Sequence, residues 1–282
     1  MTTRATLRTE ISDGVFSIVF SRPDEYNTIT PELRDDLSDA LDEADQDQDA
    51  RVILLEAEGP AFCAGYGLDW STAYQARAEG SERVWDSVTD LRLMSSFVEV
   101  YMKLWYSWKP TIAAVQGWCI AGGTDMVLCA DLIVAGDGAV FGYPPARVWG
   151  VPTTPMWVYR LGLERAKRYL LTGDEIPAAE AARIGMILES VADDALHDHA
   201  EELARRMARL PLTQLVMLKK QCNQVAENMG IASTITLGTL FDGIARHTQE
   251  GLDFVSRAEE VGFRQAVRER DDPFGDYGSR PR

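Results

Sequence analysis

Two short glycine-containing turns are the features of this sequence that most directly suggest chemistry. The first spans Phe62 to Asp69 and includes Gly65, and the second contains Gly122 and Gly123. Each turn follows a predicted strand, and the second opens a predicted helix, whose first N–H groups have no partner within the helix. One N–H group from each turn can converge on a single oxygen and stabilise its developing negative charge, as an oxyanion hole. Glycines at strand ends also serve simply to make turns, so the two turns alone leave both interpretations open.

Asp125 follows the second turn and has two possible roles. In an apolar pocket, burial raises the pKa of a carboxyl group toward neutral pH, where it can act as a general acid or base. In the first turn of a helix, a carboxylate can instead complement the helix dipole. For Asp131, which comes six residues later, we expect a structural role bracing the sheet.

Metal and nucleophilic chemistry are poorly supported. His197 and His199 are two residues apart, so on a helix they point to different faces, and we expect no metal site. Cys63 and Cys119 lie near the turns but have no histidine close in sequence, which favours packed thiols over nucleophiles. The absence of a C-x-x-C pair among the four cysteines is typical of reduced thiols in a cytoplasmic protein.

Composition narrows the class of protein. The chain has 282 residues, and its 28 Lys plus Arg against 44 Asp plus Glu give a net charge of −16, which argues against a nucleic-acid partner. The N-terminus has no apolar segment of the signal-peptide kind. The apolar stretch Thr111 to Gly136 is interrupted by Gln116, Asp125 and Asp131, so a buried strand–turn–helix is favoured over a membrane span. We therefore expect a cytoplasmic protein with no membrane partner.

The N-terminal elements that must position the turns have clear patterns. Val15 to Phe20 is a short apolar run typical of a strand. Apolar residues at helical spacing predict a helix from Pro31 to about Ala44, with Thr30 as its N-cap. Val52 to Leu55 is a second strand, and this order indicates a βαβ crossover in a parallel sheet.

The rest of the chain alternates between helix and strand and then becomes helical. We predict that Ser81 to Trp108 is mostly helical and that Thr111 to Val115 is a buried strand. Leu132 to Ala135 and Ala139 to Phe141 are predicted to be short strands. From His197 onward nearly all of the sequence has a helical pattern. The prediction is an α/β core followed by a C-terminal helical region.

Four segments in a fixed order resemble the crotonase superfamily, the enoyl-CoA hydratase/isomerase family. The resemblance extends from about Gly14 to Arg264. Its segments are Ser21-Arg22-Pro23 with Asn27; Ala61 to Gly65; Lys109 to Gly117 running into Gly122-Gly123; and Cys129 to Ala135 with Ala139 to Gly142.

The resemblance implies a fold, a ligand class and an assembly. The implied fold is an α/β spiral of ββα units with a C-terminal helical oligomerisation region. We divide it into a core with an acyl-CoA site at residues 1–195 and a helical region at residues 196–282. The implied ligand is an acyl-CoA thioester, with no cofactor beyond the coenzyme A of the substrate. The implied assembly is a trimer or a dimer of trimers.

The resemblance also assigns roles to individual residues. The oxyanion hole falls on the N–H groups of Tyr66 and Gly122, and a catalytic carboxylate falls on Asp125. Substrate and CoA binding is implied for Asp24, Tyr26, Ala64, Gly65, Gly67, Leu68, Asp69 and Gly123. The acyl pocket is implied for Tyr143, Pro145, Trp149 and Thr153, with Thr154 and Trp157 in the same segment. Basic residues that could meet the CoA phosphates are Arg22, Lys109, Arg257, Arg264, Arg268 and Arg270.

The acid–base residues depart from the hydratase pattern. Hydratases of the family have two glutamates, which fall here on Asp125 and on Pro145, and proline cannot titrate. A third position, used by dienoyl-CoA isomerases, falls near Thr153. We therefore expect Asp125 to titrate without a like-charge partner.

Hydratase activity through a thioester enolate is the expected reaction. A double-bond isomerase is the nearest alternative, because moving one proton within a substrate needs only one acid–base group. Hydrolysis of a thioester or of a carbon–carbon bond is a further alternative. A protein that binds acyl-CoA without turning it over is the alternative from another class.

Overall fold

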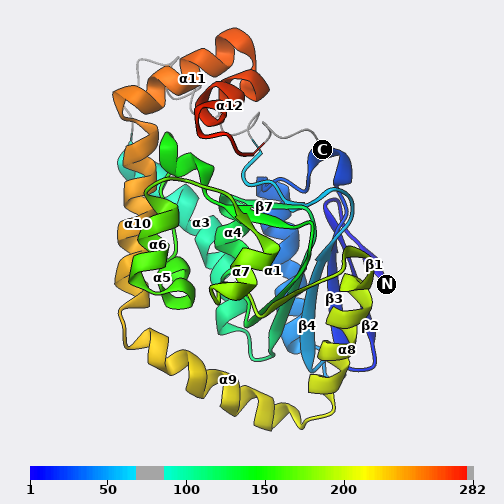
Figure 1. Ribbon diagram of the computed structural model, residues 1–282. Coiled ribbons are helices and arrows are strands. Elements are labelled where there is room, and N and C mark those ends of the chain that lie inside the picture. The colour runs from blue at the N-terminus through cyan, green and yellow to red at the C-terminus, as the bar shows by residue number, and fades with distance from the viewer. Residues whose placement is uncertain (68–85, 278–282) are drawn as a thin grey trace.

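Two sheets form the centre of the molecule in the computed structural model, which describes residues 1–67 and 86–277 (Figure 1). Within these residues the larger sheet has seven strands, in the order β1-β2-β3-β4-β6-β8-β11. From β3 to β11 neighbouring strands are parallel, and β1 and β2 add an antiparallel edge. The strands are β1 Thr2–Thr3, β2 Leu7–Ser12, β3 Val15–Phe20, β4 Val52–Ala57, β6 Thr111–Val115, β8 Leu132–Gly136 and β11 Glu189–Val191.

The smaller sheet has four described strands in the order β10-β9-β7-β5. The strands β5, β7 and β9 are parallel, and β10 pairs antiparallel with β9. Their bounds are β5 Ala61–Cys63, β7 Trp118–Ile120, β9 Val140–Gly142 and β10 Ile176–Pro177. The predicted strands near Leu132 and Ala139 thus exist as β8 and β9, but they lie in different sheets.

A repeated unit connects the two sheets. The pairs β4 with β5, β6 with β7, and β8 with β9 each place their first strand in the larger sheet and their second in the smaller one. Helix α3 (Ser87–Tyr106) follows the first pair within the described residues, and α4 (Gly122–Val127) follows the second. The predicted α/β fold of ββα units is confirmed.

The first crossover follows its sequence pattern closely. Helix α1 runs from Pro31 to Gln46, and the Thr30 side chain caps it by accepting a hydrogen bond from the Leu33 N–H group at 3.2 Å. Strand β3 then pairs in parallel with β4, with Val15 opposite Val52. The parallel pairing predicted from this strand–helix–strand order is confirmed.

Alternation along the central strands divides the buried residues between two cores. In β4, Ile53 and Leu55 face the main core, together with α1, α3 and the smaller sheet. Val52 and Leu54 face the opposite side, where helix α8 (Leu196–Ala208) covers the sheet. Helix α8 therefore packs with the α/β core, although its residues fall after position 195.

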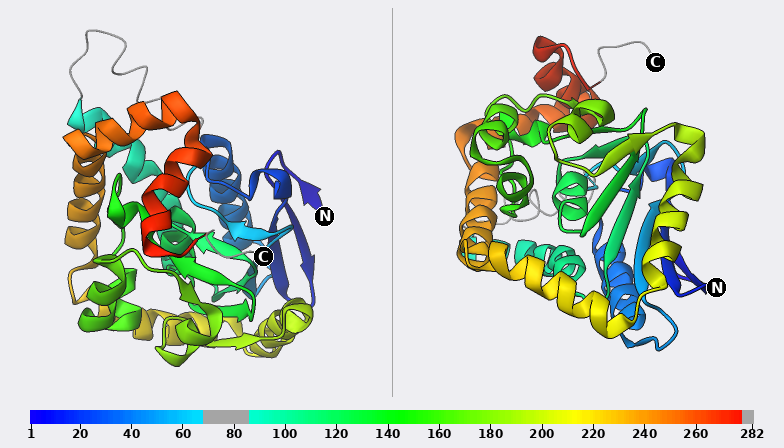
Figure 2. Two further views of the ribbon diagram at one scale, coloured as in Figure 1. Left: turned by 45° about the horizontal axis from the view of Figure 1, so that its top comes forward. Right: turned by 60° about the horizontal axis from the view of Figure 1, so that its bottom comes forward.

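The remaining C-terminal helices form an arm around the core. Figures 1 and 2 show α9 and α10 running along two sides of the molecule, with α11 and α12 at the end of α10. Helix α10 packs against α3, and α11 packs against α12. Their bounds are α9 Leu212–Glu227, α10 Ile231–Arg246, α11 Gln249–Val261 and α12 Phe263–Asp271.

An ion pair between the buried Lys219 and the partly buried Asp131 connects α9 to the sheet. Lys219 lies 2.8 Å from the carboxylate of Asp131 and donates to the carbonyl groups of Leu104 and Lys109. Asp131 also accepts a hydrogen bond from the Thr111 N–H group at 2.7 Å, which joins the start of β8 to the start of β6. The predicted bracing role of Asp131 is confirmed.

Short helices complete the described chain. They are η1 Pro23–Glu25, η2 Pro144–Arg147, α5 Met156–Leu161, α6 Leu163–Leu170, α7 Ala178–Arg183, η3 Asp193–Ala195 and η4 Asp272–Phe274. Among the residues that the structure covers, no helix combines the length and the apolar character needed to cross a membrane.

Candidate active site

The two glycine-containing turns lie against each other. Strand β5 pairs in parallel with β7, with Cys63 opposite Cys119, so the turns that follow these strands emerge at the same edge of the smaller sheet. Gly65 has a φ of +88°, and a methyl group on it would lie 3.0 Å from the Ala121 Cβ and 3.8 Å from the Gly122 nitrogen. Glycine is required at this position both by the backbone conformation and by the close approach.

Backbone hydrogen bonds on both sides hold the first turn. The Ile29 N–H group donates to the Gly65 carbonyl at 2.8 Å, and the Gly67 N–H group donates to the Ile29 carbonyl at 2.8 Å. The Ala64 N–H group donates to the Tyr26 carbonyl at 3.1 Å. The segment before α1 therefore fixes the path of the chain through Tyr66.

Asn27 anchors that segment in turn. Its side-chain amide donates to the carbonyl groups of Glu58 and Ala61, at 2.9 and 2.8 Å, and its side-chain oxygen accepts from the Arg22 N–H group. Asn27 has a φ of +50°, a left-handed conformation that asparagine adopts more readily than most residues. The role of Asn27 is thus to position the turn.

The second turn has an unusual backbone at its first residue. Ala121 has a φ of +54° and a ψ of −126°, and its N–H group donates to the Gly142 carbonyl at 2.9 Å. Strained conformations of this kind persist only where surrounding contacts hold them, often at functional sites. Gly122 begins α4, and within residues 1–67 and 86–277 its N–H group has no hydrogen-bond acceptor. An N–H donor is therefore available at this turn.

A largely apolar cavity has both turns in its wall. Apolar and aromatic side chains make up most of its lining, as in many small-molecule sites. Three of the four predicted acyl-pocket residues, Tyr143, Pro145 and Trp149, line it, and Thr153 does not. The lining residues are Ala64, Tyr66, Leu93, Met94, Ile120, Ala121, Gly122, Tyr143, Pro144, Pro145, Trp149, Asp242, Arg246, Phe263, Val267 and Arg270.

Asp125 lies behind the wall of this cavity. Its side chain is buried and accepts three hydrogen bonds from the segment around α5. One oxygen accepts from the N–H and hydroxyl groups of Thr153, at 2.9 and 3.2 Å, and the other accepts from the indole N–H of Trp157 at 3.0 Å. Asp125 is not among the lining residues, whereas Gly122, one helical turn before it, is.

The environment of Asp125 changes its acidity. Burial raises the pKa of this carboxyl group from 3.8 to about 7, and the donors on Thr153 and Trp157 oppose the rise. The negative charge of Asp242 raises the pKa of Asp125 further. A carboxyl group with a pKa near neutral pH is suited to giving and taking protons.

Asp242 on α10 is a cavity residue that the sequence analysis missed. Its carboxylate accepts from the Val151 N–H group at 3.2 Å and pairs with Arg246 at 3.2 Å. The Arg246 guanidinium also forms two hydrogen bonds with Asp90, at 2.9 and 2.8 Å. Burial raises the pKa of Asp242, while Arg246 opposes the rise.

This geometry corrects the expectation that Asp125 titrates without a like-charge partner. The expectation was based on Pro145 alone, because the sequence does not reveal that α10 returns to the cavity. The sequence nevertheless contains a feature that could have pointed to Asp242. The helix Ile231–Arg246 is otherwise uncharged, and its acidic residue Asp242 and its basic residue Arg246 are four residues apart. Such a pair on one helix face in an apolar helix is a candidate for a buried site.

The residues predicted to bind CoA are partly brought together. Asp24 lies in η1 and Tyr26 directly follows this helix. Tyr26 lies beside the first turn, because its carbonyl accepts a hydrogen bond from the Ala64 N–H group. Gly123 packs against the Cys63 carbonyl, where a methyl group would lie 2.4 Å from the oxygen. Leu68 and Asp69 lie outside the described residues.

The basic residues proposed for the CoA phosphates have different environments. Lys109 is 1% exposed and donates to the carbonyl groups of Ala44 and Asp47, so it caps the end of α1 and is wrong as a phosphate ligand. Arg270 lines the cavity, and Arg264 and Arg268 are exposed on the same helix, α12. Arg22 pairs with Glu25, and Arg257 pairs with Glu260 and Glu269.

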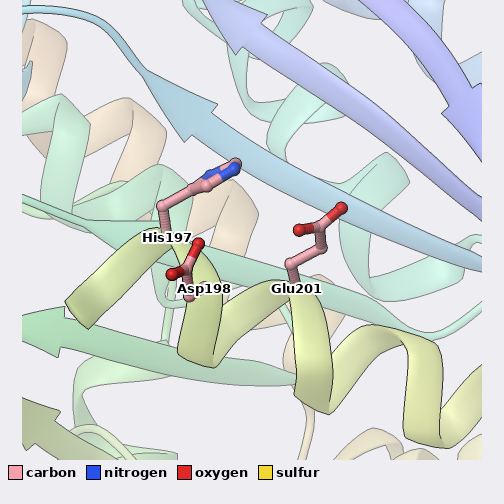
Figure 3. A group of neighbouring side chains, drawn as sticks. All are labelled: His197, Asp198 and Glu201. Atoms are coloured by element: carbon pink, nitrogen blue, oxygen red, sulfur yellow. The ribbon is translucent and has the colours of Figure 1, made fainter.

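Three side chains of a kind that can bind a metal ion lie close together on α8 and are not part of the cavity lining. Figure 3 shows His197, Asp198 and Glu201, whose potential ligand atoms lie within 4.8 Å of one another. His197 is exposed and pairs with Glu56, whereas His199 pairs with Glu189 on β11. The two histidines thus meet different partners, as their spacing predicts, and exposed acidic groups of this kind are common without a bound ion.

Repeated ββα units that bring two strand-end turns to one apolar cavity define the crotonase class of α/β proteins. The family model described as enoyl-CoA hydratase/isomerase matches residues 10–260. The chain therefore belongs to the enoyl-CoA hydratase/isomerase family and is an enzyme of this type, for which the family implies an acyl-CoA substrate.

Individual relatives agree with this assignment. The crystal structure of an enoyl-CoA hydratase from Mycobacterium smegmatis superimposes with a TM-score of 0.93 at 43% identity, covering 99% of this chain and 97% of that one. The hydroxycinnamoyl-CoA hydratase-lyase of Pseudomonas fluorescens is 30% identical over 206 residues, which are 72% of each chain. The (E)-benzylidenesuccinyl-CoA hydratase of Thauera aromatica is 30% identical over 265 residues, covering 91% of this chain and 98% of that protein.

Proposed function

We propose that the enzyme is a hydratase that adds water to the double bond of an α,β-unsaturated acyl-CoA thioester. The observation that carries this proposal is the apolar cavity with both turns in its wall, one of them presenting the N–H group of Gly122. The thioester oxygen would bind between this group and the N–H group of Tyr66. One such donor stabilises the transition state by about 2.7–4 kcal/mol.

Asp125 is the proposed proton-transfer group at the α carbon. It lies one helical turn after Gly122, and its pKa of about 7 supports proton exchange at neutral pH. Addition of water to the β carbon moves the electrons of the double bond onto the thioester oxygen, which gives an enolate. The enolate then takes a proton from Asp125 at its α carbon.

The lining of the cavity supports a bulky or aromatic acyl group. Rings of Tyr66, Tyr143, Trp149 and Phe263 line it, and aromatic side chains pack favourably against other rings. The names of two relatives, hydroxycinnamoyl-CoA hydratase-lyase and (E)-benzylidenesuccinyl-CoA hydratase, also describe aromatic thioesters.

The CoA part of the substrate would extend past the first turn. Asp24, Tyr26, Ala64, Gly65, Gly67, Leu68, Asp69 and Gly123 remain the proposed contacts on that side. Arg264, Arg268 and Arg270 of α12 are the proposed phosphate ligands. Arg270 lines the cavity and also pairs with Asp271.

Mass spectrometry of a panel of aliphatic, branched and aromatic enoyl-CoA thioesters tests the function. We expect the mass of one water to be added, fastest to an aromatic substrate such as cinnamoyl-CoA. Release of free CoA would instead indicate a hydrolase, and saturable binding without any turnover would contradict an enzymatic role on these substrates.

A double-bond isomerase is the second candidate. The observation that favours it is Pro145, which lines the cavity at the position of the second glutamate and cannot titrate. In the same panel, an isomerase would convert a dienoyl-CoA or a 3-enoyl-CoA to an isomer of unchanged mass. The two candidates are therefore separated by product mass alone.

A trimer or a dimer of trimers is the proposed assembly. Large apolar side chains are exposed along α9 and α10, among them Met217, Leu218, Val225, Leu237 and Phe241. Many exposed large apolar side chains on neighbouring helices are more than a monomer usually presents, which supports a contact between subunits. We expect light scattering at micromolar concentration to give the mass of a trimer or a hexamer, and a monomer would contradict the proposal.

A cytoplasmic location is also proposed. The described cysteines are all free thiols, and three of them, Cys63, Cys119 and Cys129, are buried. Free buried thiols are typical of reducing compartments.

A further inference from the structure

Pro145 stands where hydratases of the family have their second glutamate, and the carboxylate of Asp242 on α10 lies close to it. A methyl group placed on Gly150 would lie 2.8 Å from the Pro145 Cβ and 3.4 Å from Oδ1 of Asp242. The carboxylate of Asp242 therefore lies within a side chain's length of Pro145, and both residues line the cavity. Helix α10 thus brings a carboxylate to the region that the family's second glutamate would occupy.

The hydroxyl group of Tyr143 lies at the same place. It is also 3.4 Å from the methyl position on Gly150, and in the described parts of the chain it has no hydrogen-bond partner. Tyr143 is 5% exposed, so its hydroxyl group faces the cavity rather than bulk solvent. Asp242 Oδ1 and the Tyr143 hydroxyl group are thus an acceptor and a donor that share one corner of the cavity.

Neighbouring groups fix the orientation of Asp242. Each of its oxygens accepts one hydrogen bond, from the Val151 N–H group and from Arg246. Because Arg246 is also held by Asp90, the three charged side chains form one buried group. A carboxylate oxygen can accept two hydrogen bonds, so Asp242 retains the capacity to accept one from a water molecule.

We propose that Asp242 is the second catalytic carboxylate of the proposed hydratase, the group that takes a proton from the attacking water. This inference rests on the proposed function. The water oxygen forms a bond to the β carbon while one of its protons passes to Asp242 Oδ1, and the electrons of the double bond move to the thioester oxygen. Asp125 then gives its proton to the α carbon, which completes the addition of one water. Asp242 releases its proton to solvent and Asp125 takes one proton from solvent, so both carboxyl groups return to their starting states.

The proposal is tested by comparing the rates of two reactions in the same variants. Water addition to cinnamoyl-CoA needs both carboxylates, whereas exchange of the α protons of saturated 3-phenylpropanoyl-CoA with deuterium oxide needs only enolate formation. We expect Asp242→Asn to lower the rate of water addition on the order of 10²–10⁴-fold, the usual effect of a general base, and to change α-proton exchange only a few-fold. Asp125→Asn is expected to lower both rates.

Asp90→Asn is the matched control. Asp90 is buried and pairs with the same Arg246, but it does not line the cavity. If Asp242 acted only by holding Arg246 in place, Asp90→Asn would slow water addition to a similar extent; we expect it to stay within a few-fold of the wild type. Circular dichroism checks the fold of each variant. Asp242→Glu keeps a carboxylate, so we expect it to retain part of the wild-type rate of water addition, and it is the variant to measure if Asp242→Asn does not fold.

The outcomes separate this inference from the proposed function. A wild type that adds no water to any enoyl-CoA overturns both. A wild type that adds water, together with Asp242→Asn at the full rate, overturns the role of Asp242 alone. An equal loss of water addition and α-proton exchange in Asp242→Asn also contradicts that role, because it indicates a general disturbance of the site.

Discussion

Replacement of Asp125 by asparagine is expected to lower kcat on the best substrate by a factor on the order of 10²–10⁴. The change removes the titrating group one helical turn after Gly122 and leaves the lining of the cavity unchanged. Because Asp125 is the proposed proton donor and has a pKa of about 7, we expect the wild-type rate also to fall as the pH rises above 7. Steady-state kinetics across pH check both expectations, and CoA binding should be largely retained.

Asp131→Asn is the control for this variant. It makes the same chemical change at a carboxylate that braces β6, β8 and α9 and lies outside the cavity lining, so it should lower stability without a comparable loss of kcat. Normal turnover by Asp125→Asn would instead indicate that Asp125 has only a structural role, as the hydrogen-bond partner of Thr153 and Trp157. The proton-transfer group would then be sought among Tyr143, Asp69 and a water held by Thr153 and Thr154.

Stability measurements report on Asp125 independently of turnover. Its pKa is higher in the folded protein than the ordinary value of 3.8, so the folded state binds more protons than the unfolded chain between about pH 4 and pH 7. The stabilising contribution of the protonated group is therefore complete below pH 4 and is lost as the pH rises to 7. At 1.36 kcal/mol per pH unit, the difference between wild type and Asp125→Asn should change by roughly 4 kcal/mol across this window.

Gly122→Ala is expected to lower kcat on the order of 10²–10³-fold, the effect of removing one oxyanion donor. The new methyl group would lie 2.7 Å from the ring of Tyr66 and 2.9 Å from Ile29 Cδ1. The Tyr66 ring and the Ile29 side chain must shift to relieve this contact, and because Tyr66 belongs to the first turn, we expect its N–H group to move relative to that of residue 122. The substitution therefore disturbs the two backbone donors without changing any titrating group.

Gly162→Ala separates a loss of donor geometry from a loss of stability. Gly162 has a φ of +74° and a ψ of 165°, a conformation that is essentially restricted to glycine, so alanine there is strained by about 1–3 kcal/mol. Nothing lies within 4 Å of the new methyl group, and the residue is not in the cavity wall. We expect Gly162→Ala to unfold at a lower temperature with kcat preserved. Equal kcat values for the two alanine variants would contradict the oxyanion role of the Gly122 turn.

Local patterns were sufficient to predict the central elements of the fold. The apolar runs of β3, β4 and β6 are buried, and α1 has both an apolar face and a capping threonine. Strand β2 was missed, because its sequence Leu-Arg-Thr-Glu-Ile-Ser has only two apolar residues and its second half is exposed. Its place is determined by antiparallel pairing with β3, which is a tertiary interaction.

The candidate site likewise has features that could be predicted from the sequence and features that could not. The turns at Gly65 and Gly122 could be found from the sequence, because glycine at a strand end is a local requirement. The hydrogen bonds that Asp125 receives from Thr153 and Trp157 could not, since the partners lie 28 and 32 residues away. The approach of Asp242 to Pro145 could not be predicted either, because it depends on how α10 packs against α3.

The most direct test of the central claim is the product formed from cinnamoyl-CoA in oxygen-18-labelled water. Addition through an enolate predicts a 3-hydroxyacyl-CoA whose mass is increased by one labelled water, with the heavy oxygen on the β carbon. In deuterium oxide the same reaction should place one deuterium on the α carbon. A product of unchanged mass, or labelled oxygen found only in a free carboxylate released from CoA, would contradict the assignment as a hydratase.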